Sequence, residues 1–212
     1  MSEHFLKSTP SAFAHEFSHL LPSNYKPWGG NGLPDLYGYE QAGKGERDRF
    51  VDGWDIMGDF YQSRTPGFSA YNKLLLGWVE AKTIALSSGK VYTENLTPLE
   101  MPSGLRVIKI PLTKTTYYLI EVRKKVGFDK NLPGEGVMIY LIDETRKSGY
   151  GIVQVEDHII TTKSLNDAYF QVGSRFEDKT HHVYLYVTQK NGDVYTVVIS
   201  SSPVSTQTVE IM

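Results

Sequence analysis

The second half of the chain alternates apolar and polar residues with the two-residue period of β-strands. From about residue 85 onward this period predicts strands near 89–93, 105–112, 116–125, 136–143, 151–156, 183–190 and 193–200. In the last pair, Asn191-Gly192 stands between two alternating segments and predicts a two-residue hairpin turn. Short strands separated by Pro and Gly turns are typical of an antiparallel β-sandwich, which we expect over residues 85–212.

The first 84 residues follow a different pattern, with apolar residues at helical spacing and a long loop rich in Gly, Pro, Asn and Asp. A short helix is predicted over residues 8–21, because Ser8 or Thr9 can cap its start, Pro10 suits its first turn and Pro22 ends it. We expect four apolar side chains to back this helix: Phe13, Phe17, Leu20 and Leu21. A second helix is predicted over residues 69–78, with four core residues: Tyr71, Leu74, Leu75 and Trp78.

The first predicted helix contains the motif His15-Glu16-Phe17-Ser18-His19. Residues four apart share a helix face, so the two imidazoles can grip one metal ion. Glu16 lies beside them and is placed to take a proton from water, as zinc hydrolases require. Two surface histidines and a solvated glutamate are the simpler interpretation, but the capped helix around the motif favours a zinc site.

Two histidines leave a zinc site incomplete, because catalytic zinc generally takes three protein ligands and keeps one open position. The chain has no cysteine, which excludes Cys-based zinc sites and disulfides. The next histidine along the chain is His158, deep in the predicted β region. We therefore expect a carboxylate as the third ligand.

Several motifs resemble, in their order, those of the immune inhibitor A type of secreted bacterial and archaeal metalloproteases. They are His-Glu-Phe-Ser-His at 15–19, Gly-Leu-Pro-Asp-Leu-Tyr at 32–37, Gly-Trp-Asp-Ile-Met-Gly at 53–58, and the segments 66–78, 117–123, 132–140 and 167–173. The resemblance implies an α+β fold, with a zincin-like lower catalytic subdomain over residues 1–84 and a β-sandwich over residues 85–212. It also implies zinc-dependent hydrolysis of protein or peptide substrates, in a secreted or cell-surface protein.

The same resemblance implies roles for individual residues. His15 and His19 correspond to zinc ligands, and Glu16 corresponds to the general base. Asp35 is the Asp of the Gly-Leu-Pro-Asp motif and corresponds to the third ligand. Met57 corresponds to the methionine of a Met-turn beneath the metal site.

The sequence departs from the family pattern in two places. Asp35 lies 16 residues beyond His19 (35 − 19) where the family has six, and Pro22 stands where the family has a glycine. Asp48, Asp55 and Glu80 therefore remain rival ligands. The family's catalytic domain also has an upper half before the active-site helix, whereas this chain starts seven residues before it. We expect an upstream segment or a partner chain to complete the cleft.

Two further sites are candidates on weaker patterns. Tyr61 follows the Met-turn-like segment, where a phenol can donate to a developing oxyanion. Asp52, Asp55 and Asp59 cluster with glycines and are a candidate calcium site, although they lack EF-hand spacing.

Charge and hydropathy narrow the function classes. The net charge of −2 gives no basic field, so we expect no nucleic-acid partner. The sequence has no run of 18 apolar residues, so it predicts no membrane span. Besides the peptidase, one alternative from another class stays open: a non-catalytic β-sandwich adhesion or assembly module that has kept a relic zinc-binding helix.

Overall fold

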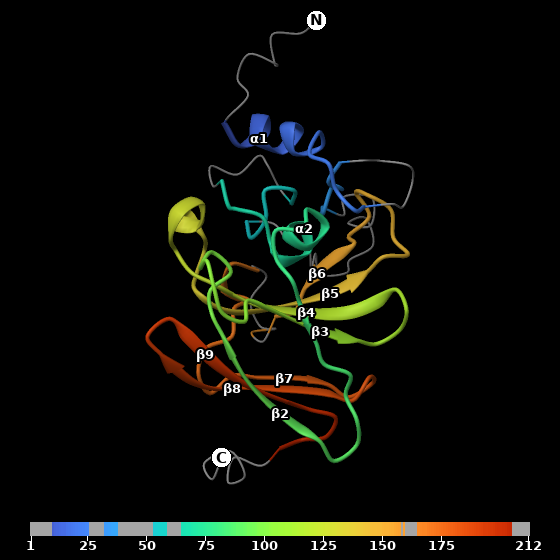
Figure 1. The fold of residues 1–212 in the computed structure, drawn as a ribbon, viewed down its shortest axis with the longest axis vertical. Coiled ribbons are helices and arrows are strands. Elements are labelled where there is room, and N and C mark those ends of the chain that lie inside the picture. The colour runs from blue at the N-terminus through green and yellow to red at the C-terminus, as the bar shows by residue number, and fades with distance from the viewer. Residues whose placement is uncertain are drawn as a thin grey trace, which may run out of the picture.

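Two β-sheets packed face to face form most of the structure, and a layer of helices and loops covers the outer face of one of them (Figure 1). The computed structural model describes residues 10–25, 32–37, 53–58, 65–157, 159 and 165–204. Within these residues the fold is β-rich, and its two α-helices are short: α1 (Pro10–Ser18) and α2 (Ala70–Leu75). Both helices belong to the layer that covers the sheet.

The strands are short, as their pattern predicts. The first sheet has the order β1-β3-β4-β5-β6, with β1 (Lys82–Thr83), β3 (Val107–Pro111), β4 (Thr116–Arg123), β5 (Gly136–Asp143) and β6 (Val153–Val155). The second has the order β2-β9-β8-β7, with β2 (Val91–Leu96), β9 (Val194–Ser200), β8 (Val183–Asn191) and β7 (Arg175–Asp178). Two 3₁₀ turns of the described part of the chain lie outside the sheets: η4 (Gly127–Asn131) and η5 (Leu165–Asp167). Neighbouring strands are antiparallel except β1 and β3.

The predicted β-rich region is confirmed, with two local differences. All seven predicted strands are present. The structure adds two strands that were not predicted, β1 and β7, because they have too few apolar residues to be recognised by alternation. The β8–β9 hairpin pairs Asn191 with Val194, so its central residues are Gly192 and Asp193 instead of Asn191 and Gly192. Gly192 has φ +58°, and glycine takes this left-handed conformation without the steric cost that other residues bear.

The five-stranded sheet is buried on both faces. Strands β4 and β5 therefore contain continuous buried runs, Tyr117–Arg123 and Gly136–Tyr140. Alternate residues serve different cores: Leu119 packs under the helix layer, whereas Ile120 packs between the sheets. The core under the helix layer takes residues from both sides of residue 84, and the predicted domain boundary there stays a prediction.

A buried charged network joins the helix layer to β4. Arg123, fully buried at the end of β4, donates to Asp129 Oδ2, to Glu121 Oε1 and to the carbonyl of Trp54. The other oxygen of Glu121 accepts the backbone N–H of Ala70, the first residue of α2. Buried charges need such partners, because an unpaired charge in this layer is strongly destabilising. The network thus fixes the segment 53–58 and α2 against the sheet.

Tyr140 gives a test of this network. Its hydroxyl donates to Glu121 Oε1 at 2.8 Å in a fully buried position. Tyr140→Phe is expected to lower the free energy of unfolding by about 1–3 kcal/mol, because a buried carboxylate loses a donor. Tyr92→Phe removes an exposed hydroxyl that bonds to the carbonyl of Ala85, and should change it by less than about 0.5 kcal/mol. Chemical denaturation measures both variants, and equal losses would contradict the predicted role of the network.

Candidate metal centre

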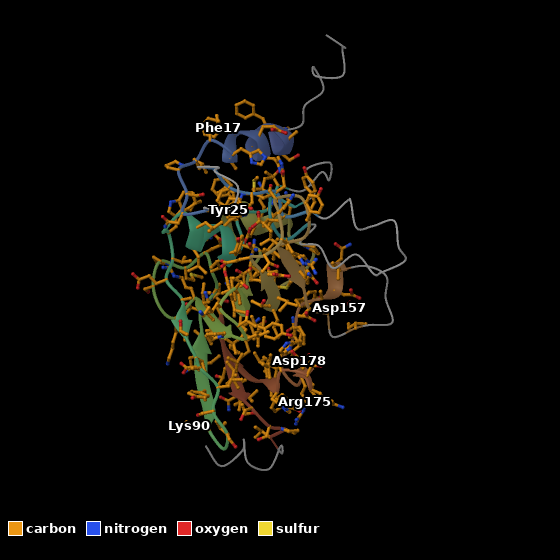
Figure 2. The ribbon with its side chains drawn as sticks, turned by 90° about the vertical axis from the view of Figure 1, so that its right-hand side faces the viewer. Phe17, Tyr25, Lys90, Asp157, Arg175 and Asp178 are labelled. Carbon is orange, nitrogen blue, oxygen red and sulfur yellow. The ribbon has the colours of Figure 1, made fainter. Side chains whose placement is uncertain are left out.

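Helix α1 turns a polar face toward the protein. Its buried side chains are Ser11, His15 and Ser18. Three of the four apolar residues expected to back the helix are instead exposed: Phe13 by 67%, Phe17 by 54% and Leu20 by 75%. That expectation was wrong, and only Leu21 packs against the core. Figure 2 shows Phe17 on the outer side of the helix and Tyr25 in the layer beneath it.

The inward orientation of α1 is fixed by hydrogen bonds from both histidines to backbone carbonyls. His15 Nδ1 lies 2.9 Å from the Ile56 carbonyl, and His19 Nδ1 lies 2.8 Å from the Leu33 carbonyl. A carbonyl only accepts, so each Nδ1 carries the proton in these hydrogen bonds. In the neutral rings, both Nε2 atoms then keep a lone pair, which is the state that a metal ligand requires.

Asp35 completes a three-residue group around the two Nε2 atoms. Its Oδ1 lies 3.1 Å from His15 Nε2 and 3.4 Å from His19 Nε2, and one ligand atom from each residue falls within 4.8 Å of the others. Two atoms bonded to a tetrahedral zinc ion at about 2.0–2.1 Å are roughly 3.4 Å apart. The donor set of two imidazoles and one carboxylate therefore fits zinc in both chemistry and spacing.

The longer connection between His19 and Asp35 is anchored where it returns to the helix. The backbone N–H of Leu33 points at the Ser18 carbonyl at 3.5 Å, and Ser23 Oγ donates to the Gly32 carbonyl. A Cβ on Gly32 would lie 1.7 Å from the His19 carbonyl oxygen, so only glycine allows this close approach. Asp35 therefore lies beside the histidines, although ten more residues separate it from His19 than in the family pattern.

The segment 53–58 supports the centre from below. The Ile56 carbonyl holds His15, and the Met57 carbonyl accepts the backbone N–H of Leu36, next to Asp35. Met57 itself is fully buried in the core under the helix layer. Its side chain acts in packing, as expected for a residue beneath the site.

The two rival ligands that the structure describes, Asp55 and Glu80, do not join the group. Asp55 is fully buried, and its carboxylate accepts the backbone N–H groups of Met57 and Ser69 and the side-chain amide of Asn72. Glu80 is exposed beyond α2. Among the residues that the structure describes, His15, His19 and Asp35 are the one group placed to hold a metal ion.

Four other candidates lie outside the described residues: Asp48, Asp52, Asp59 and Tyr61. The predicted oxyanion donor and most of the predicted calcium cluster therefore stay predictions. Asp55, the described member of that calcium cluster, gives its oxygens to protein donors instead. Trp78, expected in the core, is 55% exposed.

The electrostatics of the three residues are coupled. Burial acts to lower the pKa of His15, but the hydrogen bonds to Asp35 and to the Ile56 carbonyl outweigh it and raise the pKa. The hydrogen bond to Asp35 raises the pKa of His19 against the effect of burial, and Glu16 adds to the rise by charge. Burial would raise the pKa of Asp35, yet the two histidines hold it well below its usual range.

These shifts predict a pH dependence that zinc reverses. Without metal, raised histidine pKa values stabilise the fold below about pH 6.5, and this contribution is lost as pH rises through the raised values. The lowered pKa of Asp35 stabilises the fold above about pH 3.8. Between pH 5.5 and 8.5, unfolding midpoints should fall with pH in chelator but rise with pH in zinc, because protons compete with the metal. Asp35→Asn should flatten the chelator trend, and an unchanged trend in this variant would contradict the coupling.

Glu16 lies on α1 between the two histidine positions and is exposed. Three residues before His19, it shares that histidine's side of the helix. A carboxylate at this position has access to water and lies close enough to His19 to act on its pKa.

Sequence reasoning missed the groups that hold the three candidate ligands. The Ile56 and Leu33 carbonyls are backbone atoms, whose partners no residue pattern reveals. Ser148, in the loop between β5 and β6, lies 113 residues from Asp35 and bonds to both its backbone and its side chain. The local sequence around Ser148 has no metal-site motif, and only the fold brings the two residues together.

No helix within the described residues is long and apolar enough to cross a membrane. Comparisons of the chain with protein-family models, with curated proteins and with solved structures return no match.

Proposed function

We propose that this chain is a zinc-dependent endopeptidase of the immune inhibitor A type, or the active-site half of one, acting on protein or peptide substrates outside the cell. The observation that carries the proposal is the convergence of His15 Nε2, His19 Nε2 and Asp35 Oδ1, with both Nδ1 protons held by carbonyls. The motif resemblance in the sequence supports the same function, with the helix layer as a zincin-like subdomain.

Each residue of the centre has one task in the proposed reaction. His15, His19 and Asp35 would hold the zinc ion, which supplies a Lewis acid that polarises a carbonyl and acidifies water. Glu16 accepts a proton from the attacking water and delivers it to the departing amine. The carbonyls of Ile56 and Leu33 keep the histidine rings oriented throughout.

We propose that the outer face of α1, opposite the histidines, is an interaction surface. Phe13 and Phe17 stack there with ring centroids 6.1 Å apart, and Leu20 extends the same exposed surface. Exposed clusters of large apolar side chains mark interaction surfaces. An upstream segment or a partner chain would cover this face. The same surface favours the second candidate, an assembly module with a relic metal site.

A metal-dependent hydrolysis assay tests the proposal. The purified chain, loaded with one equivalent of zinc and tested alone and in a longer form that covers α1, should cleave fluorogenic peptide mixtures in at least one of these forms; a chelator should stop the cleavage and added zinc should restore it. Bound zinc without any hydrolysis, in the chain alone and in any longer form of it, would overturn the peptidase and favour the assembly module. Chelator-resistant cleavage would indicate a different catalyst.

A further inference from the structure

The loop between β5 and β6 closes over the segment that carries Asp35. The backbone N–H of Asp35 donates to Ser148 Oγ at 2.8 Å. Two backbone bonds run beside it: the N–H of Gly149 to the Asp35 carbonyl at 3.1 Å, and the N–H of Gly151 to the Tyr37 carbonyl at 3.0 Å. Residues 35–37 are thus held by the β region as well as by α1.

Ser148 also gives the two oxygens of the Asp35 carboxylate different partners. Its hydroxyl donates to Oδ2 at 3.3 Å, whereas Oδ1 faces both histidine Nε2 atoms. A hydroxyl that accepts from the backbone N–H and donates to Oδ2 fixes the rotation of the carboxylate about the Cβ–Cγ bond. Oδ1 is then the oxygen presented to a metal ion, and Oδ2 is already engaged.

We propose that Ser148 is a positioning residue for the zinc ligand Asp35, so that the β5–β6 loop sets the metal affinity of a site built on the other end of the chain. This inference rests on the proposed zinc site and not on the peptidase activity. Hydrogen bonds to ligating carboxylates tune metal affinity, and their loss typically costs about 10- to 100-fold.

The start of the loop forms a turn of its own. Asp143, at the end of β5, accepts from the backbone N–H and the hydroxyl of Thr145. The loop closes where β6 pairs with β5 beyond Gly151, whose φ of +72° favours glycine. Tyr37, whose carbonyl accepts from Gly151 of the loop, stacks its ring on His15 with centroids 6.4 Å apart. The loop therefore contacts both Asp35 and a residue that packs on His15.

Zinc affinity of the full chain tests the inference. We expect Ser148→Ala to weaken zinc binding by about 10- to 100-fold, measured by competition with a chromophoric chelator. Ser148→Thr keeps the hydroxyl and should restore affinity to within a few-fold. Thr145→Ala is the matched control, since it removes a hydroxyl from the same loop that bonds to Asp143 and not to Asp35. It should leave zinc affinity unchanged.

The metal-free unfolding midpoint separates positioning from a general structural role. If Ser148→Ala and Thr145→Ala shift this midpoint alike and only Ser148→Ala loses affinity, the inference is supported. Equal zinc affinity in Ser148→Ala and the wild-type chain would overturn it while leaving the zinc site standing. Absence of zinc binding in the wild-type chain would overturn both. Zinc binding without hydrolysis would overturn only the peptidase.

Discussion

His15→Ala is expected to remove stoichiometric zinc from the protein. The wild-type chain should retain about one zinc ion after dialysis, because three converging donor atoms are placed to hold it. Structural zinc sites with four ligands contribute about 10–16 kcal/mol, so one ligand accounts for roughly 3–4 kcal/mol, on the order of a hundredfold or more in affinity. His19→Ala should have the same effect. Metal analysis after dialysis measures the occupancy of each variant.

His181→Ala is the matched control for this experiment. His181 also contacts a carboxylate, that of Asp178, but it lies on the turn after β7 and belongs to no metal-competent group of the described residues. Its replacement should leave zinc occupancy at the wild-type level. Zinc retained in both His15→Ala and His19→Ala would contradict the assignment of these histidines as zinc ligands.

Glu16→Gln is expected to abolish hydrolysis while zinc stays bound. The amide keeps the size of the side chain but cannot accept a proton from water, and general-base catalysis typically contributes 10²–10⁴-fold. Glu16 is exposed, so the fold should be unaffected. The cleavage rate of a fluorogenic peptide and the zinc content of the same sample measure the two effects together.

Glu80→Gln serves as the comparison for the loss of activity. Glu80 is also exposed, and the sequence left it as a rival for the metal site, yet it lies outside the three-residue group. Its activity should match that of the wild-type chain. Full activity in Glu16→Gln would mean that another group is the base.

Local sequence patterns predicted the features that depend only on residues close together in the chain. The i, i+4 spacing of His15 and His19 places both rings on one side of α1, and alternation locates the main strands. The two-residue strand β1 is too short for such a pattern. The position of the β8–β9 turn was missed by one residue, because both Asn191-Gly192 and Gly192-Asp193 are acceptable turn sequences.

The remaining features depend on contacts between distant segments. Asp35 could not be separated from Asp48, Asp55 or Glu80, because ten extra residues removed the constraint of spacing. Its place beside the histidines depends on the close approach of Gly32 to His19. The direction in which α1 faces was also beyond local reasoning. An apolar stripe usually faces the core, but here hydrogen bonds from the histidines to two carbonyls turn the stripe outward.

Anomalous diffraction at the zinc absorption edge tests the central claim most directly. Crystals of the zinc-loaded chain should show one strong peak, bonded at about 2.0–2.2 Å to His15 Nε2, His19 Nε2 and Asp35 Oδ1. A peak on the two histidines with Asp48 or Glu80 as the third ligand would contradict the assignment of Asp35. A peak elsewhere, or none, would contradict the metal centre itself.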